Sequence, residues 1–339
     1  MHVPFSHVTY PGEEYFMVHP RFSAGLWVFA QSEEKFGGYN RALSAREQIA
    51  AAASVPGLKG LELIAPTHVT VDNAKEVKGW LEDAGLQAIA VNPLLWTEPQ
   101  WQRGALTSPD PAVRRQAIET AKRSIDIGHI LGSSKMCLWP GEDGYDYLFQ
   151  ANYGRLWELT AVGVREIAEY DPGTRIGIEY KPVEPRMHQL VSSAAKAALL
   201  GCELGLPNVG AYLDFGHALI SKETPAESVA LLSRHHRLVG VHANDNYGLG
   251  DDDIMVGAVH VWHTVEFLLA LEDADYDGWI SLDIVPRRES PVKASAQSIR
   301  TLENLLGLLA RLDRDAMRRA QEEMDALAAQ RLVQDLLAA

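Results

Sequence analysis

The chain has 339 residues, which fits either two average domains or one barrel of more than about 250 residues. Its content of 47% hydrophobic and 22% charged residues is typical of a globular protein with a large core. The formal net charge of −14 argues against nucleic acid as a partner, because phosphate binding needs a basic surface. No apolar run approaches membrane-spanning length, so no membrane association is expected. Only two cysteines occur, Cys137 and Cys202, which favours a reducing, cytoplasmic location over a disulfide framework.

Short apolar segments alternate with longer helical patterns along most of the chain. The predicted strands are 22–29, 58–64, 87–91, 135–139, 175–181, 210–215, 238–243 and 279–285. The predicted helices are 44–54, 73–84, 111–131, 153–170, 192–204, 226–233, 259–271 and 294–309. Strands of nearly continuous apolar character are typical of a parallel sheet covered by helices. The alternation predicts an α/β fold, a (β/α)8 TIM barrel over residues 21–312. A doubly wound sheet is disfavoured because no Gly-x-Gly-x-x-Gly follows the first strand.

The two ends of the chain fall outside this pattern. Residues 1–20 are predicted to be an N-terminal extension, and residues 313–339 a C-terminal helical tail. Within the tail, 314–337 is rich in Ala, Arg, Glu and Leu and predicts one helix. Such a helix either packs against its own barrel or embraces a neighbouring subunit, and we expect a homo-oligomer.

Ionisable residues gather where four consecutive predicted strands end. Glu179 and Lys181 lie two apart at the end of the strand 175–181, so both side chains point to the same face. In a barrel of this class, the groups that carry the chemistry lie at the carboxyl ends of the strands. The other members of the set are Asp214 and His217 after the sixth strand, His242 at the end of the seventh, Asp251 and Asp253 in the loop that follows, and Asp283 in the eighth. The polar Asn244 shares the face of His242.

Each of these residues has an ordinary structural explanation when it is taken alone. Asp214 could cap a helix, His242 could be a core histidine, and 251–253 could be a solvated turn. Together they would crowd carboxylates at one end of a barrel, where buried like charges cost several kcal/mol. A divalent cation removes that cost, and oxygen ligands with one or two imidazoles suit Mg2+, Mn2+ or Co2+. The sequence therefore predicts a site for one or two such ions.

Several segments resemble the xylose isomerase-like TIM-barrel superfamily, with a likeness to xylose isomerases through most of residues 20–290. The most specific segment is Glu179-Tyr-Lys-Pro-Val-Glu-Pro-Arg186. Arg21-Phe-Ser-Ala-Gly-Leu-Trp27 resembles a first-strand signature that ends in a sugar-contacting tryptophan, and 104–115 and 138–144 match further family segments. The substrate-binding residues expected from this resemblance are Trp27, Trp96, Trp139 and Arg186.

The resemblance also implies metal ligands and catalytic residues. Lys181 would contact a substrate oxygen and act with Glu179 and His217 in catalysis, and Asp214 would bridge two metals. The ions would be Mn2+ or Mg2+, with Co2+ possible. The implied ligands are Glu179, Asp214, His242 and Asp283 for the first metal, and Asp214, His217, Asp251 and Asp253 for the second.

The chain departs from xylose isomerases in two places. His242 stands where those enzymes have a carboxylate, and the His-x-Asn-Asp form resembles rhamnose isomerases, epimerases and endonuclease IV-like proteins. Ile64 stands where a histidine opens the sugar ring, and His68 comes later. The second departure argues against glucose or xylose as the substrate.

The leading hypothesis is a metal-dependent sugar isomerase or epimerase, acting on a metal-chelated sugar by a hydride shift or through an enediolate. The alternative is the large subunit of a C-glycoside deglycosidase, a lyase that enolises a 3-keto glycoside and eliminates the aglycone with a small partner subunit. That substrate needs no ring opening, so Ile64 counts in favour of the lyase. A non-catalytic sugar-binding barrel and an endonuclease IV-like phosphodiesterase are weaker alternatives.

Overall fold

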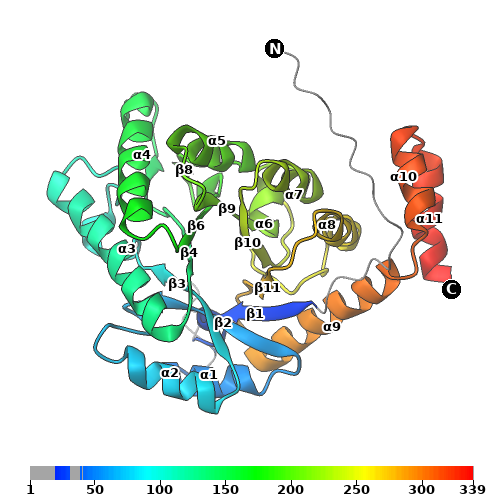
Figure 1. Cartoon of the computed structure of the whole chain (residues 1–339), viewed down its shortest axis with the longest axis horizontal. Coiled ribbons are helices and arrows are strands. Elements are labelled where there is room, and N and C mark those ends of the chain that lie inside the picture. The colour runs from blue at the N-terminus through cyan, green and yellow to red at the C-terminus, as the bar shows by residue number, and fades with distance from the viewer. Residues whose placement is uncertain (1–19, 31–38, 40, 339) are drawn as a thin grey trace.

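A computed structural model of the chain describes residues 20–30, 39 and 41–338. The predicted N-terminal extension lies outside the described residues, apart from residue 20. Eight parallel strands form one sheet in the order β3-β2-β1-β11-β10-β9-β6-β4, and helices surround it (Figure 1). The strands are β1 (Arg21–Gly25), β2 (Leu58–Ala65), β3 (Gln87–Pro93), β4 (Lys135–Leu138), β6 (Arg175–Glu179), β9 (Val209–Asp214), β10 (Leu238–Ala243) and β11 (Trp279–Leu282). The predicted TIM barrel is confirmed.

The sheet closes almost completely. Parallel ladders join seven neighbouring pairs, and β3 and β4 lie side by side at the remaining seam. The side chain of Asn92 bridges that seam, because its Oδ1 accepts a hydrogen bond from the Cys137 backbone N–H at 2.9 Å. Its Nδ2 donates to Glu62 Oε2 on β2 at 3.0 Å. The carboxyl ends of all eight strands therefore surround one opening.

The outer helices bury their apolar faces against the outward side chains of the strands. Leu61 and Leu63 of β2, for example, are completely buried. Burying one such side chain stabilises the fold by roughly 2 kcal/mol. In the described part of the chain, no helix combines the length and apolarity needed to cross a bilayer. The outer helices are α1 (Ala45–Ala53), α2 (Ala74–Asp83), α3 (Pro111–Leu131), α4 (Tyr153–Tyr170), α5 (Ala194–Leu204), α7 (Pro225–Arg234), α8 (Val261–Asp273) and α9 (Pro291–Leu309).

The first strand is shorter than the predicted 22–29. It ends at Gly25, and η1 (Leu26–Phe29) is a 3-10 turn. The chain turns here because Gly25 has no Cβ: a Cβ would lie 2.1 Å from Trp27 Cε2. The turn carries the Trp27 indole over the glycine, which a continued strand would not allow.

Short elements that the sequence does not predict lie among the connections. A helix, α6 (Phe215–Ile220), begins directly after β9. The loops after β4 and β6 are joined by an antiparallel sheet whose strands are β5 (Gly144–Tyr145), β7 (Val183–Glu184) and β8 (Met187–Gln189). A 3-10 turn, η2 (Pro99–Trp101), follows β3. Strands of two or three residues give no periodic signal in a sequence.

The tail contains two helices rather than the predicted single helix. α10 (Arg314–Glu322) and α11 (Ala326–Ala338) are separated by a break at Met324, whose φ is +54°. Asp325 begins α11 by accepting from the backbone N–H of Ala328 at 3.0 Å. The tail lies at the end of α9 (Figure 1). Met317 of α10 is buried in the main hydrophobic cluster. The homo-oligomer stays a prediction.

Candidate metal centre

Four predicted ligands converge at the carboxyl end of the barrel. Glu179 is the last residue of β6 and Asp214 the last of β9, while His242 lies near the end of β10 and Asp283 directly follows β11. One ligand atom from each of the four lies within 4.8 Å of the others. The predicted ligands of the first metal thus form one group, which we call the first cluster.

The imidazole of His242 stands at the centre of the first cluster. Its Nδ1 lies 2.9 Å from Glu179 Oε1, 3.3 Å from Asp283 Oδ2 and 4.0 Å from Asp214 Oδ2. Its Nε2 lies 3.1 Å from Glu62 Oε1. Burial alone would lower the pKa of His242, but the carboxylates of Glu62 and Glu179 raise it well above its ordinary value. Positive charge is therefore stabilised at this position between the carboxylates.

Glu62 is a further residue of the candidate centre, and it was not predicted from the sequence. It is completely buried and accepts hydrogen bonds from Tyr212 Oη at 2.6 Å and from Asn92 Nδ2 at 3.0 Å. Burial would raise the pKa of Glu62, but His242 and these hydrogen bonds lower it to about 2. An ionised carboxylate behind a metal-ligating histidine fixes the orientation of the ring. The available signal was a glutamate within an apolar strand, the same signal that identified Asp283.

A second group of ligand atoms lies beside the first. One atom each of Asp214, His217 and Asp251 lies within 4.8 Å of the others. His217 Nε2 lies 3.2 Å from Asp251 Oδ2, and its Nδ1 lies 3.8 Å from Asp214 Oδ1 and 3.7 Å from Glu179 Oε1. Asp214 belongs to both groups and also caps α6, accepting from the His217 backbone N–H at 2.7 Å. The structural and the ligating interpretations of Asp214 are therefore compatible.

Asp253 is the remaining predicted ligand of the second metal. Among the described residues it lies outside both of these groups of ligand atoms, although it lines the cavity that they face. Its Oδ1 accepts from Asn244 Nδ2 at 3.1 Å, and the same amide donates to Asp214 Oδ2 at 2.8 Å. Burial, with Asp251 and Asp283 adding to it, raises the pKa of Asp253 well above its ordinary value. Asn244 thus holds two carboxylates that would otherwise repel each other.

The donor set fits a divalent cation. Burial raises the pKa of Asp214 to about 7 even though His217 opposes the shift. In the described part of the chain, His217 Nδ1 is buried without a hydrogen-bond partner although it faces two carboxylates. Carboxylate oxygens with one or two imidazoles suit Mg2+, Mn2+ or Co2+. A cation bound among these groups would relieve the repulsion and give the imidazole a partner.

Lys181 is a buried cation at the edge of the clusters. Its Nζ lies 2.6 Å from Asp251 Oδ2, pairs with Glu184, and lies 5.4 Å from the centre of the Trp139 ring. Burial would lower the pKa of Lys181, but Asp251 and Glu184 outweigh it and raise the pKa above its ordinary value. Lys181 is therefore suited to donate a hydrogen bond, and not to act as a base.

The clusters face a cavity of about 420 Å3 that the predicted aromatic walls line. Trp27, Trp96 and Trp139 all contribute, and the rings of Trp96 and Trp139 meet edge to face at 4.8 Å. Trp27 Nε1 also donates to Asp283 Oδ1 at 2.7 Å, so this wall is fixed to the first cluster.

Arg186 does not reach this cavity, although the resemblance implied substrate binding. Its side chain is 73% exposed and pairs with Asp146 at 3.1 Å. It lies between the short strands β7 and β8, on the loop that follows β6, and a different arginine, Arg287, lines the cavity.

The position of the ring-opening histidine is apolar. Ile64 lines the cavity. His68 is buried, and its Nδ1 accepts from the Ile64 backbone N–H at 2.9 Å. Burial lowers the pKa of His68 to about 4, so the ring is neutral and stabilises the turn after β2.

The fold and the site define a TIM barrel with a carboxylate–imidazole centre at the carboxyl ends of its strands. A family model described as "Xylose isomerase-like TIM barrel" matches residues 49–305. The chain belongs to this family, which confirms the resemblance seen in the sequence.

Named relatives and solved structures agree with this assignment. A probable sugar isomerase of Rhizobium meliloti (strain 1021) is 30% identical over 234 residues, covering 67% of this chain and 54% of that protein. A xylose isomerase of Thermus thermophilus is 25% identical over 210 residues, covering 60% and 54%. The chain thus spans about half the length of the curated relatives it matches. The crystal structure of a D-allulose 3-epimerase from Methylomonas sp. shares the fold, with a TM-score of 0.67, 20% identity, and coverage of 84% of this chain and 96% of that one.

Proposed function

We propose that this protein is a divalent-metal-dependent sugar isomerase or epimerase. The observation that carries the proposal is the first cluster, buried beneath a tryptophan-lined cavity and next to Lys181. The relatives named sugar isomerase and xylose isomerase support the class of reaction. Glu179, Asp214, His242 and Asp283 would hold one Mn2+ or Mg2+, with Co2+ as an alternative. A second ion would use Asp214, His217 and Asp251, with Asp253 as a fourth candidate.

When bound, the ion would stabilise negative charge on substrate oxygens while hydrogen moves between neighbouring carbons. Lys181, held protonated by Asp251, would donate a hydrogen bond to a substrate oxygen. Glu179 and Asp283 both line the cavity, so either carboxylate could accept a proton from carbon. The tryptophans would contact the apolar face of the sugar and exclude water. His217 would take part as an imidazole held between Asp214 and Asp251, where it would also be a ligand of the second ion.

The test is an NMR-followed incubation of Mg2+- or Mn2+-loaded protein with a panel of aldoses and ketoses in D2O. New sugar signals would support an isomerase or epimerase, and deuterium at the reacting carbon would favour an enediolate over a hydride shift. Asp214→Asn serves as the matched control, because it removes a ligand and keeps the size of the side chain. Conversion by this variant at the wild-type rate would contradict the proposal.

A second candidate is a metal-dependent lyase that cleaves 3-keto C-glycosides with a small partner subunit. The observation in its favour is the apolar wall at Ile64, together with the neutral, buried His68, because no histidine is placed there to open a ring. Incubation of the metal-loaded protein with a 3-keto C-glucoside, with release of the aglycone followed by chromatography, tests it. Sugar conversion in the first experiment without aglycone release in the second would exclude the lyase.

A further inference from the structure

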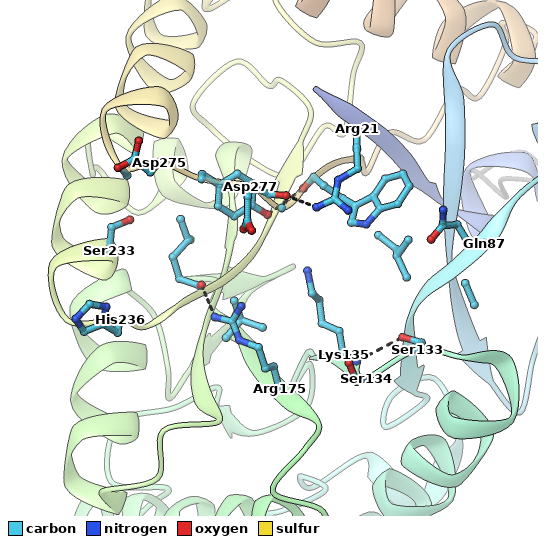
Figure 2. Close-up of a pocket in the computed structure, with 18 of the residues that line it drawn as sticks. Arg21, Gln87, Ser133, Ser134, Lys135, Arg175, Ser233, His236, Asp275 and Asp277 are labelled. Atoms are coloured by element: carbon cyan, nitrogen blue, oxygen red, sulfur yellow. Dashed lines mark hydrogen bonds between the residues drawn. The ribbon is translucent and has the colours of Figure 1, made fainter. Parts of the chain in front are cut away.

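A second cavity, of about 480 Å3, lies at the opposite end of the barrel from the metal centre. The first residues of several strands line it, including Arg21 of β1, Lys135 of β4 and Arg175 of β6. Figure 2 shows these three side chains extending toward the same space. An acidic protein with a net charge of −14 thus gathers three cations in one cavity.

Two carboxylates share the cavity with these cations but form no direct ion pair with them. Among the described residues, Arg21, Lys135 and Arg175 form no ion pair with an acidic side chain, although Asp275 and Asp277 also line the cavity. Arg21 donates to the backbone carbonyl of Asp277 and lies 5.1 Å from the centre of the Trp279 ring. Arg175 donates to the Leu238 carbonyl at 2.8 Å. Both guanidiniums therefore keep donors that the protein does not pair with a charge.

Lys135 is the least satisfied of the three. It is half-buried, and its Nζ forms no hydrogen bond or ion pair with another described residue. Burial lowers the pKa of Lys135, and Arg175 and Arg21 lower it further against the opposing charges of Glu62 and Asp277. An ammonium desolvated beside two other cations is costly unless an anion joins it.

The barrel interior continues this polar region. Ser23 and Ser281 are cross-strand neighbours on β1 and β11, two positions after Arg21 and Trp279. Both hydroxyls are completely buried and have no hydrogen-bond partner among the described residues. Neither serine lines the cavity, so these hydroxyls are suited to a buried water in the barrel interior and not to direct contact with a ligand.

We propose that the cavity at the amino ends of the strands binds a small multiply charged oxyanion, carried by a phosphate or carboxylate group. Two guanidinium forks and one ammonium around a shared space match the geometry of such groups. A volume of about 480 Å3 holds more than one inorganic phosphate, so a metabolite that bears the anionic group fits. This site is separate from the metal centre and does not rest on the proposed activity.

The test measures binding of inorganic phosphate and of citrate to the full chain by calorimetry at constant ionic strength, with chloride as the replacement ion. We expect the wild type to bind one of the two, and the better ligand distinguishes a phosphate from a carboxylate site. Lys135→Met should weaken that binding by at least about tenfold, which corresponds to about 1.4 kcal/mol. The matched control is Lys59→Met, an exposed lysine on β2 outside the cavity, and it should bind like the wild type.

A thermal shift without either anion gives a second readout. Lys135→Met removes an unpaired, half-buried charge, so its Tm should equal or exceed that of the wild type, while the anion-dependent rise in Tm disappears. Binding of neither anion by the wild type would overturn the proposal and leave the three cations a role in the fold only. Wild-type affinity in Lys135→Met would also overturn it, because the anion would then bind elsewhere.

Discussion

Replacing Glu62 with glutamine tests whether this carboxylate positions the central imidazole of the candidate metal centre. Glu62 faces His242 Nε2 at 3.1 Å and accepts from Tyr212 Oη and Asn92 Nδ2. Glutamine has the same shape, but one of its terminal atoms can only donate. If the glutamine oxygen faces Tyr212 and His242, the glutamine nitrogen faces the Asn92 amide nitrogen. Both of these nitrogens are donors, so neither has an acceptor there. Asn92 cannot simply rotate its amide, because its oxygen accepts from the Cys137 N–H.

The structure sets the size of the effect. One buried donor left unpaired costs about 1–3 kcal/mol. The pKa of Glu62 falls from 4.5 to about 2 in the folded protein, which corresponds to about 3 kcal/mol. Because this pKa is depressed, the stabilisation is present above pH 4.5 and is lost as the pH falls through about 2. Near neutral pH the variant should therefore lose about 3 kcal/mol of unfolding free energy.

Two assays separate the role of Glu62 in orienting His242 from its contribution to the stability of the fold. Calorimetry with Mn2+ near neutral pH should show an affinity about 10- to 100-fold weaker in Glu62→Gln, as for other groups that orient a metal-ligating histidine. Urea unfolding in the presence of a chelator measures the stability loss by itself. Glu303→Gln, on the exposed side of α9, is the matched control and should change neither quantity. Wild-type Mn2+ affinity in a destabilised Glu62→Gln would refute the positioning role.

Three further predictions concern the metal centre and Lys181. Asp214→Asn keeps a side chain able to cap α6, so the variant should fold. Its Mn2+ affinity, measured by calorimetry, should fall by more than about 100-fold. Normal Mn2+ binding by this variant would show that the proposed ligands are wrong. In the wild type, burial raises the pKa of Asp214 to about 7, so below that pH the metal must displace its proton. Mn2+ affinity should then fall at least about tenfold per pH unit, and a flat profile would contradict this. Lys181→Met should bind Mn2+ nearly as tightly as the wild type and lose about 10²- to 10³-fold in kcat on a sugar identified by the NMR panel. A parallel loss of Mn2+ binding would instead make Lys181 part of the metal site.

The side chains that gather at the strand ends could be predicted from the sequence, because residues two apart in a strand point to the same face of the barrel. Glu179 and Lys181 are both buried at the carboxyl end of β6, as their spacing indicates. Asp214 and Asp283 were found as carboxylates within apolar runs. Their convergence in one cluster follows from the parallel order of β6, β9, β10 and β11, which the alternation of strands and helices already implied.

The residues that hold these groups in place could not be predicted in the same way. Glu62 reaches His242 from the other side of the barrel, and Asn92 lies near it only because the ladder between β2 and β3 shifts register between Leu61 and Glu62. Such an irregularity leaves no mark in the apolar pattern. The position of Arg186 depends on the small β5-β8-β7 sheet, whose strands are too short to show a period.

The geometry of the candidate metal centre is set one layer below its carboxylates and imidazole, by a tyrosine and two glycines. The Tyr212 ring on β9 lies between Gly177 of β6 and Gly240 of β10: a Cβ on Gly240 would lie 2.4 Å from Tyr212 Cε2, and one on Gly177 2.8 Å from Cδ2. Glycine weakens a strand interior, so two such positions need a packing reason. The reason is that the ring, confined between these strands, directs its hydroxyl to Glu62 at 2.6 Å and lies 4.6 Å from the His242 ring. The glycines admit the tyrosine, the tyrosine fixes the carboxylate, and the carboxylate fixes the imidazole that faces the proposed metal.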